Sequence, residues 1–259
     1  MRKAISLLYG IASYVFFLGV FLYSLGFVSG FGVPRSIDSA DGTPALAAGL
    51  IDCVLLGLFA VQHSVMARPT FKRWWTRFVP GEIERSTFVL LSSLLMALLF
   101  WQWRAIPSMV WQVGSPAGAA AIWAAYCLGW MVVLFSTFMI SHFDFFGLRQ
   151  VWLAARDVPY RPPEFATSLL YRVVRHPLML GFVIAFWATP AMTVGHLLFA
   201  LLSTGYILVG IQLEEKDLVR EHGVRYEEYR RQVSMILPLS KPIARSSDHH
   251  DPAPRGVSR

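Results

Sequence analysis

A run of 36 residues, from Leu178 to Leu213, contains no Lys, Arg, Asp or Glu. A single straight helix of this length would measure about 54 Å at 1.5 Å per residue, whereas the hydrocarbon core of a bilayer is about 30 Å thick. Thr189-Pro190 and Gly195-His196 interrupt the middle of the run, and clustered Pro and Gly favour a reversal of the chain. The run therefore predicts two membrane helices that form a hairpin, so that its two ends return to the same membrane face.

Four further apolar segments precede this run, and the composition favours placing them in lipid. Apolar residues make up 55% of the 259 residues and charged residues only 15%, which is unusual for a water-soluble domain. The first segment has 28 uncharged residues, whereas the apolar region of a cleaved signal peptide has about 7–15. Trp101 and Trp103, which end the third segment, are typical of interfacial anchors. The segments are Ile5–Gly32, Ala45–Met66, Ser86–Trp103 and about Gly118–Ser141. We predict an all-α integral membrane protein with about six transmembrane helices, the last two a helical hairpin.

The distribution of basic residues predicts the orientation. With six spans, 21 of the 23 Lys and Arg residues fall on one face, and only Arg35 and Arg104 fall on the other. Basic loops face the cytoplasm, so we expect a multi-pass protein of the bacterial inner (cytoplasmic) membrane with both termini cytoplasmic. The net charge of +7 is spread between apolar spans rather than gathered in a basic domain, which argues against nucleic-acid binding.

The chain divides into three predicted regions. Residues 1–141 form a four-span membrane region, residues 142–240 contain the hairpin and a cofactor site, and residues 241–259 form a polar disordered tail. Within the second region, two short cytoplasmic helices separated by Gly223 are expected from Glu214 to Val233, as a C-terminal cap on the bundle. Cys53 and Cys127 lie in apolar runs, and no zinc-type spacing occurs. His249 and His250 are more typical of a frayed tail than of a metal site. We expect no metal, and the oligomeric state is left open.

The two polar ends of the apolar run are the first candidates for chemistry. Arg175-His176-Pro177 precedes the run, and Glu214-Glu215 follows it. A hairpin would bring these two clusters together at one membrane face. The alternative is that the glutamates only begin a solvated helix, because acidic residues are favoured in a first helical turn.

These clusters also carry a family resemblance. Arg-His-Pro is followed by Gly181, then by Glu-Glu-x-x-Leu, Gly-x-x-Tyr-x-x-Tyr and a late proline, Pro238. This order resembles the isoprenylcysteine carboxyl methyltransferase superfamily of membrane methyltransferases, which includes the NnrU-like proteins. The resemblance implies S-adenosyl-L-methionine as cofactor, and it implies that Arg175 pairs with one of the two glutamates. The cofactor-binding residues that it implies are Tyr171, Arg175, His176, Pro177, Leu180, Gly181, Glu214, Glu215, Leu218, Tyr226 and Tyr229.

A second candidate cluster follows the fourth span, where His142 and Asp144 lie among aromatic residues. Ionisable groups near a membrane core are costly and often functional. Because a thiolate rather than a thiol is the nucleophile in sulfur alkylation, His142 or Asp144 is a candidate general base, with Arg175 as a third catalytic residue. The alternative is an interfacial pair that binds backbone and headgroups. Phe143, Phe145 and Phe146 are expected to wall the substrate pocket.

Two polar positions in the second span are harder to assign. His63, beside Gln62, is a candidate substrate-binding residue, although polar contacts between helices are the alternative role. Asp52 lies deeper in the span and is expected to pair with Gln62 or His63. His196 is expected to cap the hairpin turn on the far face.

Three segments, at residues 62–69, 142–151 and 182–190, resemble a bacterial branch of the same superfamily that methylates small thiols. This resemblance implies methylation of methanethiol to dimethyl sulfide, with the small thiol and the lipid bilayer as partners. The alternatives are an isoprenylcysteine-like or other lipophilic substrate, an NADPH-dependent membrane reductase of the sterol-reductase type that uses Arg225, Arg230 and Arg231, and a non-enzymatic membrane assembly or transport protein.

Overall fold

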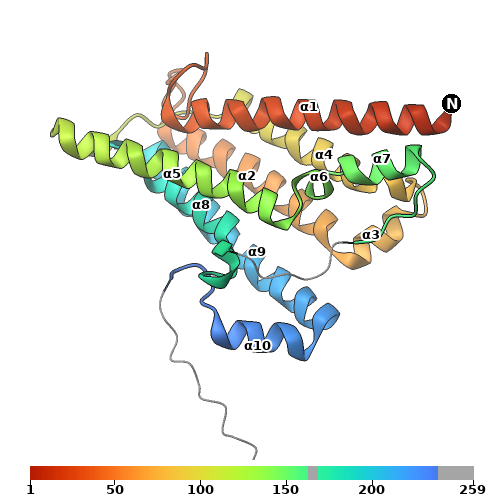
Figure 1. The fold of residues 1–259 in the computed structure, drawn as a ribbon. Helices are drawn as coiled ribbons and strands as arrows, with labels where there is room; N and C mark the ends of the chain where they lie inside the picture. The colour runs from red at the N-terminus through yellow and green to blue at the C-terminus, as the bar shows by residue number, and fades with distance from the viewer. Residues whose placement is uncertain (163–168, 239–259) are drawn as a thin grey trace, which may run out of the picture.

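The computed structural model describes residues 1–162 and 169–238 and consists almost entirely of helices (Figure 1). Within these residues, five helices are long and apolar enough to cross a membrane. The prediction of an all-α membrane protein is therefore confirmed. The five helices are α1 (Arg2–Ser29), α2 (Ala45–Ala67), α4 (Gly81–Gln102), α5 (Pro116–Ile140) and α9 (Val194–His222).

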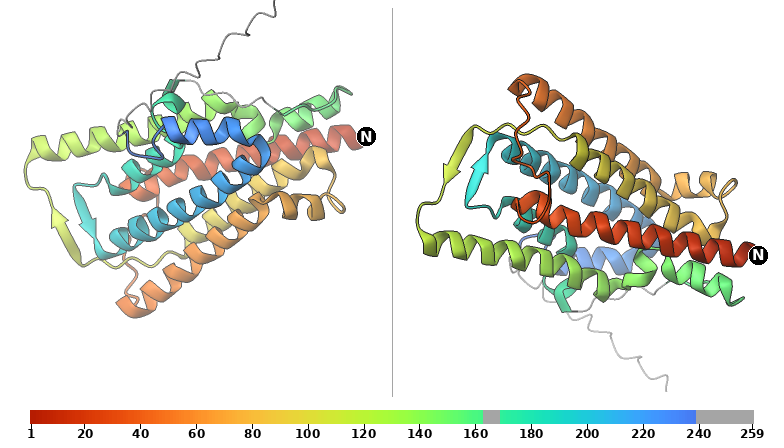
Figure 2. Two further views of the ribbon diagram at one scale, coloured as in Figure 1. Left: turned by 90° about the horizontal axis from the view of Figure 1, so that it is seen from below. Right: turned by 90° about the horizontal axis from the view of Figure 1, so that it is seen from above.

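Shorter elements connect and extend these helices. They are α3 (Pro69–Trp75), α6 (His142–Phe145), α7 (Leu148–Ala155), the 3-10 helix η1 (Leu169–Arg172), α8 (Pro177–Trp187) and α10 (Val224–Gln232), with two strands, β1 (Met109–Gln112) and β2 (Ala191–Thr193). The strands lie at one end of the bundle and the N-terminus lies at the other (Figure 2). The predicted tail, residues 241–259, lies outside the described residues.

The long apolar run folds back on itself, but its two arms are unequal. α8 has 11 residues and measures only about 16 Å at 1.5 Å per residue, so α8 alone is shorter than the hydrocarbon core. It ends just before the Thr189-Pro190 break, and the chain continues in extended form as β2, which pairs antiparallel with β1. The sequence analysis did not predict this two-stranded sheet. At the turn, His196 Nε2 lies 2.9 Å from the Phe186 carbonyl oxygen at the end of α8, as expected for a cap.

The returning arm, α9, is longer than predicted. It continues without a break through Glu214 and Glu215 to His222, so the expectation that a short helix begins at Glu214 is wrong. Its 29 residues span about 43 Å, and the excess length carries the two glutamates beyond the apolar part of the helix. Gly223, with a φ of 56°, ends α9 as predicted and lets α10 begin in a new direction.

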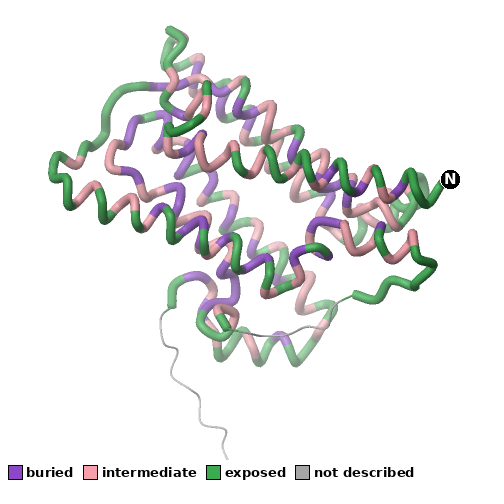
Figure 3. The backbone as a smooth tube through the Cα atoms, turned by 45° about the horizontal axis from the view of Figure 1, so that its top comes forward, coloured by how far each residue is buried: buried purple, intermediate pink, exposed green. Residues whose placement is uncertain are grey.

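The outward faces of the helices are apolar and exposed, whereas burial is concentrated on their inward faces (Figure 3). Leu46, Leu50 and Phe135 are more than half exposed, which is the pattern expected of side chains that contact lipid. Trp101 is 64% exposed, but Trp103 is only 2% exposed and donates from its indole nitrogen to the Ile37 carbonyl oxygen at 3.0 Å. Trp103 is therefore a core residue, and the interfacial role predicted for it is wrong.

The polar residues of α2 also differ from expectation. Asp52 is buried and accepts a hydrogen bond from the backbone nitrogen of Arg104 at 3.0 Å, rather than from Gln62 or His63. Ten residues along a helix correspond to about 15 Å, which is too far for direct contact. Gln62 and His63 instead contact Ser92 of α4, each at 3.3 Å. This is the polar contact between helices that was considered as the alternative for His63.

α5 and α8 approach closely where two glycines face each other. A Cβ atom added at Gly181 would lie 2.7 Å from the Gly129 carbonyl oxygen and 2.8 Å from the Val133 backbone nitrogen. A small residue is therefore required at this crossing. Gly181, which was expected at the cofactor site, has a packing role here.

We expect Gly181→Ala to destabilise the protein, because the methyl group would push against backbone that cannot move independently. Overpacking of this kind typically costs about 1–3 kcal/mol. Thermal unfolding in detergent would measure the change, with Gly205→Ala as the control, since a Cβ atom there meets open space. An unchanged midpoint for Gly181→Ala would contradict the close crossing.

We expect residues at the two ends of the bundle to be accessible from opposite sides of the membrane. In a background with Cys53→Ala and Cys127→Ala, a membrane-impermeant maleimide should label Ser39→Cys and Ser115→Cys from one side only. The same reagent should label Arg77→Cys and Arg225→Cys from the other side only. Labelling of Ser39→Cys and Arg77→Cys from one common side would overturn this arrangement.

Candidate active site

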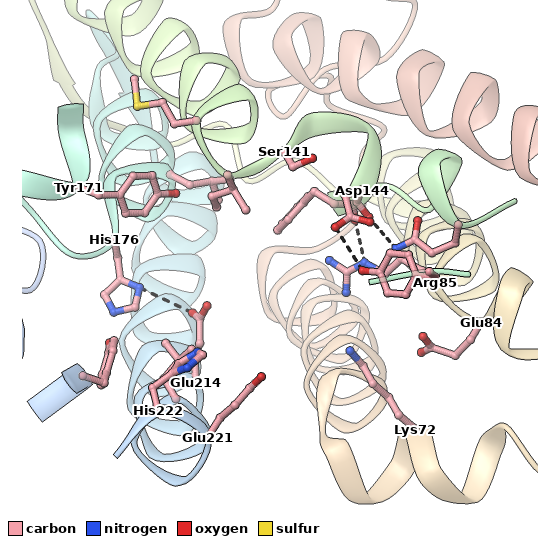
Figure 4. Close-up of a pocket in the computed structure, with 18 of the residues that line it drawn as sticks. Lys72, Glu84, Arg85, Ser141, Asp144, Tyr171, His176, Glu214, Glu221 and His222 are labelled. Carbon is pink, nitrogen blue, oxygen red and sulfur yellow. Dashed lines mark hydrogen bonds and ion pairs between the residues drawn. The ribbon is translucent and has the colours of Figure 1, made fainter. Parts of the chain in front are cut away.

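A cavity of about 880 Å³ lies at the end of the bundle opposite the strands. Binding sites for small molecules typically measure about 300–1,000 Å³. Its walls come from both halves of the chain, and Figure 4 shows Lys72, Arg85 and Asp144 on one side with Tyr171, His176 and Glu214 on the other. The cavity thus joins the two clusters that the sequence analysis treated separately.

A buried ion pair lies at one side of the cavity. Arg175 Nε lies 2.7 Å from Glu215 Oε1, and His176 Nε2 lies 3.1 Å from the same oxygen. All three side chains are buried. Arg175 Nη1 also donates to the Val233 and Arg230 carbonyl oxygens, at 2.5 Å and 3.1 Å. Glu215 is therefore the glutamate that pairs with Arg175, a choice that the sequence left open.

Glu214 has a different environment from its neighbour. Its side chain is 47% exposed and faces the cavity, where one carboxylate oxygen lies 3.6 Å from His176 Nδ1. His176 therefore lies between a buried and an accessible carboxylate. Of the two glutamates, only Glu214 lines the cavity.

Three tyrosines, Tyr171, Tyr226 and Tyr229, line the same side of the cavity. The Tyr229 hydroxyl donates to the Tyr171 carbonyl oxygen at 2.5 Å, which fixes α10 against η1. Burial raises the pKa of Tyr229 to about 12 and raises the pKa values of Tyr171 and Tyr226 as well. These hydroxyls therefore stay protonated at neutral pH, and the Tyr229 proton is already used in the bond to the Tyr171 carbonyl oxygen.

Asp144 lies across the cavity, on α6. Ser141, with a φ of 143°, ends α5 and redirects the chain into this short helix. Asp144 is 6% exposed; its Oδ2 accepts from the Tyr160 hydroxyl at 3.2 Å and lies 3.5 Å from Arg149 Nη1. Its Oδ1 has no hydrogen-bond partner among the described residues. A buried carboxylate oxygen in this state is unusual and favours a ligand contact.

His142 is placed differently from Asp144, although it is only two residues away. Its Nε2 lies 2.7 Å from the Tyr14 hydroxyl and its Nδ1 lies 2.8 Å from Thr137 Oγ1, so both ring nitrogens are engaged. The ring stacks on Phe138 with centroids 4.3 Å apart. Burial lowers the pKa of His142, so the imidazole is neutral at pH 7. His142 does not line the cavity.

The predicted site residues therefore separate into two groups. Those that line the cavity are Asp144, Phe145, Tyr171, Arg175, His176, Glu214, Leu218, Tyr226 and Tyr229. Those that lie outside its lining are His63, His142, Phe143, Phe146, Pro177, Leu180, Gly181 and Glu215. Of the three phenylalanines, Phe143 is 56% exposed and Phe146 stacks on Phe17 with centroids 4.0 Å apart.

The sequence analysis missed a further set of lining residues. The basic residues among them were used only to predict the topology. That they face a cavity could not be predicted, because their positions depend on the packing of α3, α4 and α7. An Arg at the start of an apolar span was the one available signal. The missed polar residues are Lys72, Glu82, Glu84, Arg85, Ser141, Gln150, Tyr160, Glu221 and His222. In the described part of the chain, no group of three or more His, Cys, Asp or Glu side chains is arranged to hold a metal ion.

A multi-pass helical bundle with a cavity at one end, lined by ionisable groups such as Arg175, His176 and Asp144, defines an integral membrane enzyme. The family model described as NnrU protein matches residues 52–211, and the chain belongs to this family. It is 59% identical to the methanethiol S-methyltransferase of Mycobacterium tuberculosis over 92% of this chain and 98% of that one. It is 54% identical to methanethiol S-methyltransferase 2 of Bradyrhizobium diazoefficiens, over 98% of this chain and 97% of the relative. A methanethiol S-methyltransferase of Crocosphaera subtropica is 50% identical, over 92% and 94%. No solved structure gives a significant match to the chain.

The different positions of the two glutamates predict different effects of substitution. Glu215→Gln leaves Arg175 buried without its counter-charge, and breaking a buried pair typically costs about 3–5 kcal/mol. We expect Glu215→Gln to lower the unfolding midpoint in detergent markedly, whereas Glu214→Gln should change it little. The reverse ranking of the two variants would contradict the pairing.

Proposed function

We propose that this chain transfers a methyl group from S-adenosyl-L-methionine to a small thiol, converting methanethiol to dimethyl sulfide. The observation that carries the proposal is the arrangement of one cavity. Tyr171, His176 and Glu214 line one side, which we call the Glu214 wall, and Asp144 with its unpaired oxygen lies on the opposite side. The names of the relatives support the choice of methanethiol.

The Glu214 wall suits the cofactor. S-Adenosylmethionine carries a ribose, an ammonium group and an adenine, which require a carboxylate, hydrogen-bond donors and apolar or aromatic surfaces. Glu214 and His176 would hold the polar end, with the Tyr171 hydroxyl as a donor, and Leu218 and Met179 would contact apolar parts. When bound, the cofactor supplies an electrophilic methyl group on a positively charged sulfur. The chemistry of these side chains therefore fits this group.

Asp144 is the proposed base. Its Oδ1 is buried and has no hydrogen-bond partner among the described residues, so this oxygen would accept the thiol proton. A positioned general base typically contributes 10²–10⁴-fold in rate, by order of magnitude. Asp144 is favoured over His142, because both His142 nitrogens are engaged outside the cavity. Holding the thiol in a reactive position contributes a larger part, up to about 7–11 kcal/mol for well-oriented groups.

An apolar hollow next to the cavity supports entry of the thiol from the membrane. The hollow measures about 500 Å³ and is lined by side chains of α5, of η1 and of the residue that follows η1, all of them apolar. Met139 lines both the hollow and the cavity. A small apolar thiol dissolves in lipid, so we place its entry here. Phe143 and Phe146, which were expected to wall the substrate pocket, lie outside the cavity lining. The lining residues of the hollow are Leu128, Met131, Val132, Phe135, Met139, Leu169, Leu170 and Val173.

The proposed location is the bacterial inner membrane, with the cavity and both termini on the cytoplasmic side. This orientation is supported by the basic residues, which are concentrated at the end of the bundle that holds the cavity. The four-span region, residues 1–141, supplies lining residues such as Lys72 and Arg85, and residues 142–240 supply others, such as Asp144 and Glu214. The cavity therefore requires both proposed regions.

The alternatives gain less support. Arg230, one of the arginines considered for the phosphate of NADPH, lies 3.4 Å from Glu215 and so takes part in the buried ionic cluster. A scaffold or transport role would not require a buried carboxylate with an unpaired oxygen in a cavity. We therefore retain methyl transfer as the proposed activity.

We expect Asp144→Asn to lower the rate of dimethyl sulfide formation by roughly 10²–10⁴-fold, while S-adenosylmethionine affinity stays unchanged. The asparagine variant cannot accept a proton, so part of the rate should return as pH rises and the thiol ionises in water. Headspace gas chromatography with purified protein would measure the product, and calorimetry would measure the cofactor affinity. His142→Ala is the comparison and should cost much less.

Two outcomes would count against these assignments. Wild-type protein that forms no dimethyl sulfide from methanethiol and S-adenosylmethionine would overturn the function. A folded His142→Ala variant that loses as much activity as Asp144→Asn, or an Asp144→Asn variant as fast as wild type, would overturn the choice of base.

A further inference from the structure

We propose that Arg85 binds the sulfur of the thiol substrate as its thiolate, beside Asp144, so that the wall formed by α4 and α6 is a thiol subsite separate from the cofactor side. The inference rests on the proposed function and adds to it a residue that lies outside the resemblance motifs.

Arg85 is held by part of its guanidinium only. Its Nε donates to the Phe145 carbonyl oxygen at 2.7 Å, and the guanidinium lies over the rings of Phe88 and Phe145, 5.0 Å and 4.9 Å from their centroids. Within the described part of the chain, its two terminal nitrogens have no hydrogen-bond partner, and Arg85 lines the cavity. The side chain is therefore fixed in place with most of its donors available to a ligand.

Arg85 and Asp144 share this wall without neutralising each other (Figure 4). No ion pair of 4.0 Å or less joins them in the residues that the structure describes. Asp144 Oδ2 instead accepts from Tyr160 and lies 3.5 Å from Arg149 Nη1. Asp144 Oδ1 has no partner there. Arg85 is thus a cation with free donors, and Asp144 is a carboxylate with a free acceptor oxygen. A ligand that suits both groups gives a proton to Asp144 and then carries a negative charge beside Arg85.

A thiol meets this requirement better than the carboxylate of the cofactor does. The cofactor carboxylate would bring a second negative charge next to Asp144, and like charges repel at this range. A thiol instead gives its proton to Asp144 Oδ1, and the resulting thiolate lies beside the guanidinium, which lowers the pKa of the thiol. The ring of Phe145, which lines the cavity, offers an apolar contact for the methyl group.

The step balances within the site. The S–H bond breaks, an O–H bond forms at Asp144 Oδ1, and the electron pair stays on sulfur. No oxidant or reductant is needed. The step precedes methyl transfer, so thiol binding can be measured in the absence of the donor.

The test compares Arg85→Gln and Arg85→Lys with wild type, with Arg77→Gln as the matched control, since Arg77 is exposed and lies outside the cavity lining. Arg85→Gln should raise the KM for methanethiol by at least roughly tenfold, as expected for a lost charge-assisted contact. It should also shift the pH profile of turnover to higher pH. Arg85→Lys should recover part of the thiol affinity, and S-adenosylmethionine affinity should stay within about twofold of wild type.

A second measurement does not depend on turnover. Methanethiol mixed with wild-type protein at neutral pH, without donor, should give the ultraviolet absorption of a bound thiolate, and Arg85→Gln should lose this band while Arg77→Gln keeps it. A thiolate band in wild type without any methyl transfer would fail the proposed function and leave the thiol subsite standing.

Three results would overturn the inference. Arg85→Gln could weaken cofactor binding while thiol saturation is unchanged, which would assign Arg85 to the cofactor. All affinities and the unfolding midpoint could fall together, with no recovery in Arg85→Lys, which would assign a packing role. Arg85→Gln could match wild type in every measurement while dimethyl sulfide still forms, which would sink the subsite and leave the function intact.

Discussion

The buried contact between Arg175 and Glu215 fixes the arrangement on which the site depends. Two charges removed from water are tolerated only when they are paired and hydrogen-bonded, and here one carboxylate serves both Arg175 and His176. Nη1 of Arg175 donates to the carbonyl oxygens of residues 230 and 233. Backbone bonds from Arg175 and His176 to residues 234 and 235 hold the same segment. One ion pair thus joins the start of α8, the end of α9 and the chain beyond α10.

This pairing determines which groups are left for chemistry. Glu215 is committed to Arg175, so Glu214 is the accessible carboxylate and His176 orients between the two. The tyrosines of η1 and α10 are held by the same packing and remain protonated, with Tyr229 bonded to the Tyr171 carbonyl oxygen. A substitution that breaks the ion pair is expected to disturb stability and site geometry together, which is why Glu214 and Glu215 cannot be treated as equivalent.

The position of the second wall depends on the close crossing of α5 and α8. Gly129 and Gly181 let the two backbones approach closely. As a result, α5 ends at the rim of the cavity, and Ser141 and α6 follow it there. Asp144 faces the cavity, while His142 turns toward Tyr14 and Thr137. Arg85, from α4, and Lys72, from α3, lie on the same side of the cavity as Asp144 (Figure 4). The far end is closed separately, by the two strands and by contacts such as Asp52 with Arg104.

The sequence by itself determined the membrane class, the approximate positions of the long helices and the meeting of Arg175-His176 with Glu214-Glu215. These follow from apolar length, from the Pro and Gly breaks and from the order of the motifs, all of which are local properties of the chain. The tertiary structure decided which glutamate pairs with Arg175, that α9 continues past both glutamates, that Trp103 is core and that His142 turns away from Asp144. It also brought Arg85 and Lys72 into the cavity. These outcomes depend on which face of each helix meets its neighbours, and the packing of distant segments sets that face, whereas hydropathy along the chain does not.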